Sequence, residues 1–223
     1  MSRFRVTPVV AVLALAVAAI RPAWAITDQE VLVEKARLTV QTLLADPDYA
    51  PLRTSLENAQ AVLIVPELLK GGFIIGGQGG NGVLVARDED GRWGDPAFYL
   101  IAGASIGLQI GGQVSELVMA IMTEDGLNAI LDHNAKIGAD VSAALFTVGA
   151  GVGASTGLDT NADMYAFSRN QGLFAGGALG GSVISEKADW NRAYYGAGAT
   201  GRGVLDGRFS NPHGQALSEA LPE

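Results

Sequence analysis

From Ala59 onward, short apolar runs alternate with glycine, and this pattern limits the possible folds more than any other feature of the chain. Most of the 30 glycines lie in this region, often in pairs, as at Gly71-Gly72, Gly76-Gly77, Gly111-Gly112 and Gly176-Gly177. Glycine inside a strand marks a bulge, a bend or a close approach of two backbones. We therefore predict an α+β domain: a strongly curved, Gly-rich antiparallel β-sheet or small barrel, with an amphipathic N-terminal helix and short additional helices packed on it.

The expected strands are the apolar runs between the glycines, at 61–65, 72–75, 83–86, 98–101, 117–122, 141–148, 164–168, 173–175 and 182–184. Asp88-Glu89-Asp90-Gly91 predicts a hairpin turn between two of them. A membrane-spanning barrel is the rival interpretation. The aromatic content of only 7% argues against it, because such barrels carry aromatic girdles.

Helices are expected before and between these strands. Thr27 and Glu30 have the spacing of a capping box, which predicts a helix from Thr27 to about Asp46. Its apolar residues fall on one arc, which indicates an amphipathic helix packed on its own domain rather than on a membrane: Leu32, Val33, Ala36, Val40, Leu43 and Leu44. Shorter helices are expected at 51–58 and 125–131.

Residues 1–25 have the pattern of a cleavable signal peptide. Arg3 and Arg5 precede an apolar stretch of 12 residues, Val9–Ile20, and Ala23-Trp24-Ala25 follows as a cleavage site. Twelve residues are too few for a membrane anchor, which needs roughly 20. We expect one domain at 26–205 and a C-terminal tail at 206–223.

The absence of cysteine and the net negative charge limit where the protein is expected to be located and which partners it is expected to bind. Without cysteine there is no lipobox and no disulfide, so a periplasmic or secreted location is expected. The leader holds 3 of the 15 basic residues, which leaves 12 Lys and Arg against 23 Asp and Glu, a net charge of −11. This balance excludes nucleic acid as a partner and weakens any general attraction to anionic lipids.

Two glycine motifs suggest chemistry that their surroundings do not support. The segment 77–82 fits G-x-G-x-x-G, but an apolar strand follows it instead of a helix, so we interpret it as a hairpin turn. The segment 103–107 fits G-x-S-x-G, and a serine hydrolase would pair Ser105 with His133 or His213. The βα alternation of a hydrolase is missing, so we predict no catalytic residue and no enzyme.

Metal and cofactor sites are not expected either. Asp159 to Asp163 resembles the start of a calcium loop, but Met164 and Asn170 stand where that loop needs Gly and Glu. A zinc site has no support, since the mature chain has no cysteine and two distant histidines.

Ordered blocks along the chain resemble the SYLF domain, a family known for lipid binding and, in yeast, for actin binding. The blocks cover roughly residues 30–205 and lie at 65–73, 76–84, 91–93 with Pro96 and Phe98, 103–111, 136–140, 165–176 and 191–196. One departure is visible: Leu179-Gly180-Gly181 stands where relatives usually carry an acidic residue before the glycine, so any role of that carboxylate is in doubt here.

The resemblance implies a non-catalytic module that binds phospholipid or a membrane surface, of the kind that binds phosphoinositides in eukaryotic relatives. The candidate binding residues are Lys70, Trp93, Lys136 and Arg169, which supply cations for phosphate and a ring for a lipid interface. The alternative is a protein-protein interaction or structural module at the envelope that presents a sheet edge to its partner. Actin binding rests on the family resemblance alone.

Overall fold

The computed structural model describes residues 26–72, 75–106, 111–132, 134–148, 162–171 and 179–223. Several predicted features lie outside the described residues: the signal peptide expected at 1–25, Phe73 and Ile74, the strand expected at 173–175, the calcium-like loop at 159–161, and His133. Among the described helices, none has the length and hydropathy that crossing a membrane requires.

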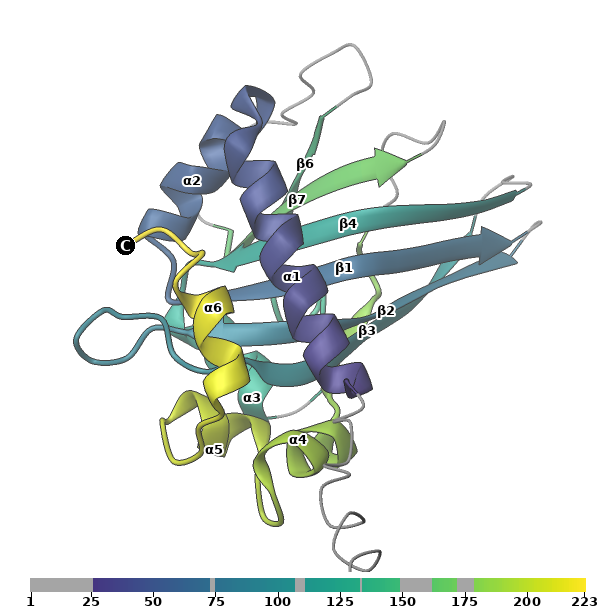
Figure 1. Cartoon of the computed structure of the whole chain (residues 1–223). Helices are drawn as coiled ribbons and strands as arrows, with labels where there is room; N and C mark the ends of the chain where they lie inside the picture. Colours follow the sequence, from purple (N-terminus) through teal and green to yellow (C-terminus); the bar gives the residue numbers. More distant parts are fainter. Residues whose placement is uncertain (1–25, 73–74, 107–110, 133, 149–161, 172–178) are drawn as a thin grey trace, which may run out of the picture.

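The described residues form a curled sheet of eight strands in the order β5-β8-β3-β2-β1-β4-β7-β6 (Figure 1). This confirms the predicted α+β fold with a strongly curved, Gly-rich sheet, which has the form of a half-barrel. The strands are β1 (Ala61–Gly72), β2 (Ile75–Ala86), β3 (Ala97–Ile106), β4 (Gly111–Ile121), β5 (Ala135–Lys136), β6 (Ala143–Val148), β7 (Met164–Gln171) and β8 (Val183–Glu186).

One strand pair differs from the antiparallel prediction. β6 runs parallel to β7, from Ala143 opposite Met164 to Val148 opposite Arg169, while the other ladders between named strands are antiparallel. The physical reason is the long connection between the two strands, because a tight hairpin forces antiparallel pairing and a long crossover does not.

The N-terminal helix α1 (Asp28–Ala45) crosses one face of the sheet (Figure 1). The capping box is confirmed: the Thr27 hydroxyl accepts a hydrogen bond from the Glu30 amide, and the Glu30 carboxylate accepts one from the Thr27 amide at 2.8 Å. The predicted apolar arc is buried, apart from Leu44, which is half-buried. The other helices are α2 (Ala50–Glu57), α3 (Glu124–Asp132), α4 (Ala188–Tyr195), α5 (Gly201–Leu205) and α6 (Gln215–Ser218).

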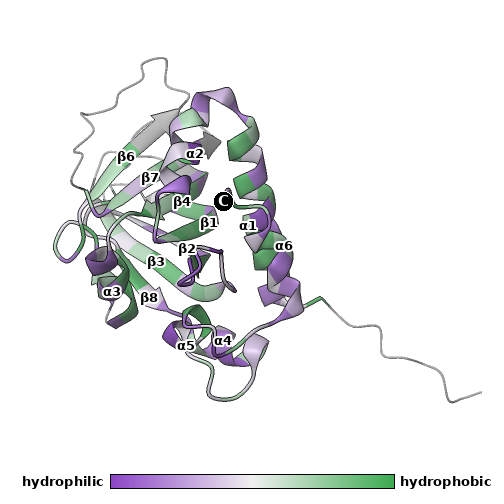
Figure 2. Ribbon diagram, turned by 90° about the vertical axis from the view of Figure 1, so that its left-hand side faces the viewer, coloured by the Kyte–Doolittle hydropathy of each residue, from purple (hydrophilic) through white to green (hydrophobic). Residues whose placement is uncertain are grey.

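The two faces of the sheet carry separate apolar clusters, because side chains alternate along each strand. One face packs under α1, α2 and α6 and buries Val62, Ile64, Val83, Phe98 and Val118 with the apolar arc of α1. The opposite face buries the alternate residues of the same strands together with α3, α5 and the short strand β5. Figure 2 shows α1 and α6 together on one side of the sheet.

The segment 77–82 is not a hairpin turn, as the sequence suggested, but the interior of β2. Pro66 and Glu67 form a bulge opposite it, since β1 has one residue more than either neighbour at this point. A Cβ on Gly80 would lie 2.5 Å from the Glu67 carbonyl oxygen, and one on Gly82 would lie 2.7 Å from that of Ile64. Glycine is therefore needed here for close packing of the sheet and not for a turn. The turn at Asp88–Gly91 is where it was predicted, with Gly91 at φ +79°.

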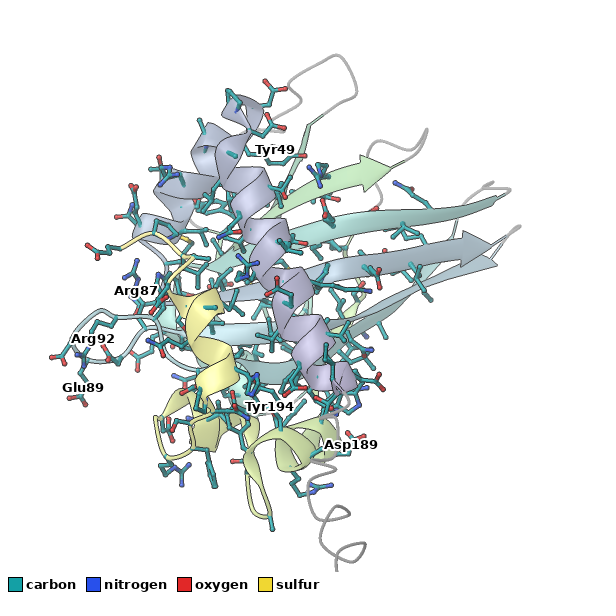
Figure 3. The ribbon with its side chains drawn as sticks, viewed as in Figure 1. Tyr49, Arg87, Glu89, Arg92, Asp189 and Tyr194 are labelled. Carbon is teal, nitrogen blue, oxygen red and sulfur yellow. The ribbon has the colours of Figure 1, made fainter. Side chains whose placement is uncertain are left out.

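The C-terminal segment 206–223 packs against this framework. Leu217 and Leu221 are buried in the cluster under α1. The Trp93 indole donates to the Pro222 carbonyl at 2.7 Å, and the Arg87 guanidinium lies 4.3 Å from the Trp93 ring centroid and donates to the same carbonyl. These contacts attach the last residues to the turn between β2 and β3. Figure 3 shows Arg87 near the start of that turn.

Replacing Gly82 by alanine is expected to destabilise the fold by about 1–3 kcal/mol, because the added methyl group must displace the backbone of β1. For a chain of this size that corresponds to a fall in melting temperature of roughly 2–4 °C per kcal/mol. Gly79→Ala is the matched control, since its Cβ would have only an ordinary contact of 3.5 Å to the Ile101 carbonyl oxygen. Equal melting temperatures for the two variants would contradict this account of the sheet.

Candidate functional site

The four residues proposed from the sequence do not come together in one site. Trp93 follows β2, next to the end of the sheet where Ala61 pairs with Ala86, whereas Lys70 lies nine residues further along β1. At about 3.3 Å per residue the two are roughly 30 Å apart. Trp93 is half-buried between Arg87 and Pro222, so its contacts hold the C-terminal segment.

Arg169 is engaged in a partly buried ion pair. On β7, its Nε donates to Glu116 Oε2 of β4 at 2.5 Å, and the side chains are 31% and 16% exposed. Thr39 of α1 donates to the other oxygen of Glu116 at 3.4 Å. Tyr49, which follows α1, donates to the Ser168 carbonyl at 3.2 Å, and its burial raises its pKa to about 12. Arg169 thus links β7 to Glu116 of β4, which in turn contacts α1 through Thr39.

Lys70 lies on the opposite face of the sheet from Arg169. It is half-buried beside Gln78 of β2 and Gln113 of β4, and Gln78 donates to the Ser182 hydroxyl at 2.7 Å. Within the described part of the chain the Lys70 ammonium has no carboxylate partner. Burial lowers its pKa, since desolvation disfavours the charged form.

The remaining candidates are on the periphery or unsuited to catalysis. Lys136 is exposed in the edge strand β5. Ser105 lies within β3 opposite Gly76, and not at the strand-to-helix turn that a nucleophile elbow requires. Leu179, at the position of the family's acidic residue, is buried in the apolar cluster, where an unpaired carboxylate would be costly. Among the described residues, no group of three or more His, Cys, Asp or Glu is arranged to hold a metal.

Residues that were not predicted as candidates from the sequence form an exposed surface beside α1. We call it the α1 flank and define it as Val31, Lys35 and Leu38 of α1 with Glu67 and Leu69 of β1 and Val114 of β4. The three α1 residues lie on one stripe of the helix, at spacings of four and three. Its four apolar side chains are exposed by 40–59%, and Leu69 and Val114 are cross-strand partners.

Grooves surround the α1 flank because the strands run on past the helix (Figure 1). One groove of about 520 Å³ lies between the start of α1 and strands β1, β2 and β3. A second, of about 280 Å³, lies between the rest of α1 and strands β1 and β4. A third, of about 580 Å³, adjoins Ile26 and His213. Lys35 borders all three.

The charge at the centre of the α1 flank is held loosely. Lys35 Nζ lies 2.9 Å from Glu67 Oε1, with the two side chains 44% and 59% exposed. An exposed ion pair of this kind contributes little to stability, so both groups can take other partners. The bulge at Pro66 and Glu67 turns Glu67 toward α1. The ion pair could not be predicted from the sequence, because the contact depends on a one-residue shift in strand register.

The described residues form a single sheet-and-helix framework with an exposed apolar surface beside α1. Comparison with known proteins identifies the family to which the chain belongs. Residues 102–223, more than half of the chain, match the sequence model of the family described as "Ysc84: Las17-binding protein actin regulator". The chain belongs to this Ysc84 family, which confirms the SYLF resemblance. That description names protein binding and regulation and no enzyme reaction.

Full-length relatives extend well beyond this chain. LAS seventeen-binding protein 3 of Saccharomyces cerevisiae is 34% identical over 160 residues, 70% of this chain and 35% of that protein. Protein YSC84 of the same yeast is 32% identical over 160 residues, covering 70% and 34%. SH3 domain-containing YSC84-like protein 1 of Homo sapiens is 32% identical over 134 residues, covering 60% and 39%. The chain thus spans between a third and two fifths of the length of these relatives.

Glu116→Gln is expected to destabilise the fold by about 1–3 kcal/mol, because it leaves the Arg169 guanidinium partly buried without a carboxylate. The double variant Glu116→Met/Arg169→Met removes both charges and is expected to recover most of that loss in urea unfolding. A double variant that stays as unstable as Glu116→Gln would contradict this structural role of the ion pair.

Proposed function

We propose that this chain is an exported, non-catalytic lipid-binding module that acts at the bacterial envelope, with the α1 flank as its contact surface. The observation that carries the proposal is the exposed apolar group Val31, Leu38, Leu69 and Val114, gathered from two strands and a helix around one loosely held lysine. Contiguous exposed apolar side chains mark interaction surfaces, and a membrane is the partner that the family resemblance favours.

Charge determines which kind of membrane contact this surface supports. Lys35 is accompanied on or beside the α1 flank by Asp28, Glu34 and Glu67, and Arg37 already pairs with Glu34. A surface with more carboxylates than free cations gains little from the overall negative charge of an anionic membrane. Burial of apolar side chains is therefore the proposed driving force, and raising the salt concentration is expected to leave binding largely intact.

Leu38→Asp/Leu69→Asp is expected to reduce recovery in liposome flotation at least ~tenfold, because two exposed apolar groups are replaced by carboxylates that cannot enter the interface. The melting temperature should stay near that of the unaltered chain, since neither side chain is part of the core. Thr54→Asp, on the exposed side of α2, is the matched control and should float normally. Normal flotation of the double variant would refute the assignment to the α1 flank.

The second candidate is a protein-protein interaction or structural module. Two observations favour it: relatives are named for binding Las17, and β6 is the last strand of the described sheet. The β6 sequence Ala143–Val148 carries no charge and no proline, the usual protections of an edge strand.

Under this candidate, a pulldown from envelope extract recovers one stoichiometric protein while liposomes recover nothing. Ala144→Lys places a charge on the edge strand and is expected to abolish that capture. Capture that survives Ala144→Lys would show that the partner does not pair with β6.

A further inference from the structure

The groove of about 520 Å³ beside the α1 flank has the shape and lining of a site for a single apolar chain. Its volume falls within the range of about 300–1,000 Å³ that is usual for small-molecule sites. Its apolar lining includes Val31 of α1, Leu69 of β1, Leu100 of β3 and Trp190 of α4, and Asn81 of β2 is part of its polar lining. The Trp190 ring is fixed edge-on to Phe98, with ring centroids 5.9 Å apart.

The floor of this groove includes bare backbone at Gly79 and Gly80 of β2, next to Asn81. Gly79 has no side chain to fill the space, and its strand is paired on both sides, with Gly79 opposite Leu69 of β1 and Ala102 of β3. Backbone groups engaged in these ladders are not available to hydrogen-bond a peptide laid across them. An alkyl chain needs no hydrogen bonds and suits such a floor better than a peptide does.

One cation at the rim can pair with an anionic headgroup. Lys35 stands at the rim in an exposed ion pair with Glu67, which an incoming anion can replace. Among the residues that line the groove, Lys35 is the cation, and Asp28 and Glu67 are the carboxylates. An anionic headgroup would therefore bind at Lys35, by displacing Glu67 from the ion pair.

We propose that this groove holds one acyl chain of an amphiphile whose anionic headgroup, a carboxylate or a phosphate, pairs with Lys35. The inference rests on the proposed lipid-binding function and narrows it: the chain takes up a single lipid molecule in addition to contacting a membrane surface.

The test measures binding of monomeric amphiphiles below their micelle concentration by tryptophan fluorescence and native mass spectrometry. The probes are oleate, a lysophosphatidic acid and an uncharged monoacylglycerol. The unaltered chain is expected to bind one equivalent of oleate or of lysophosphatidic acid, and the stronger of the two identifies the headgroup. Lys35→Met should weaken the anionic probes at least ~tenfold and leave the monoacylglycerol unchanged.

Gly79→Leu should weaken every probe at least ~tenfold, because its side chain occupies the floor of the groove. Gly71→Leu on β1, where a Cβ meets nothing within 4 Å, is the matched control and should bind normally. If Gly79→Leu does not fold, Val31→Trp replaces it as the test variant. Its larger side chain enters the groove from α1 and should likewise weaken every probe at least ~tenfold. Normal binding by a folded Gly79→Leu or Val31→Trp variant overturns the inference.

Liposome flotation separates this inference from the proposed function. If the unaltered chain floats with liposomes but binds no monomeric amphiphile, the groove inference fails and the membrane-contact function stands. If it neither floats nor binds a monomer, both fail.

Discussion

The structure depends on the close approach of β1 and β2. At this point β1 carries the bulge at Pro66 and Glu67, and β2 carries glycines in place of larger residues. At Gly80 and Gly82 a single methyl group would collide with the β1 backbone, and at Gly103 it would meet Ser182 of the turn before β8. Bulges and glycines increase the twist and bend of a strand, so the sheet curls instead of lying flat. Within this curled sheet, strands distant in sequence, such as β3 and β8, form one ladder.

That curl gives the two faces of the sheet different roles. The face packed against α3 and α5 is largely core, with Lys70 and Gln78 as its polar part. The other face is only partly covered, because α1 lies across strands that continue beyond it (Figure 1). The uncovered part is where glycines and exposed apolar side chains meet, and this explains why grooves follow the flank of α1.

Several helices, strands and turns could be predicted from patterns of neighbouring residues. The residues of the candidate site could not, because their contacts depend on the register of the strands. The capping box, the apolar arc of α1 and the Asp88–Gly91 turn could be read from neighbouring residues alone. The 77–82 segment was misassigned because a glycine run has the same composition in a turn and in a crowded strand. The Lys35–Glu67 pair was invisible, since it requires the β1 bulge and the docking of a helix 32 residues away. The contacts of Trp93 and Arg169 could not be predicted either, since their partners, Pro222 and Glu116, are distant in the chain.

The strand order also affects how this chain reaches its native state. β1 pairs with β4 across an intervening hairpin, β3 pairs with β8 about eighty residues later, and β6 joins β7 in parallel. Each pairing closes a long loop whose entropy is lost before the contacts form, and topologies rich in such pairings fold slowly. A polypeptide that collapses late remains extended for longer after synthesis. Its arrangement of strands therefore affects how long the newly made chain stays unfolded and accessible to chaperones.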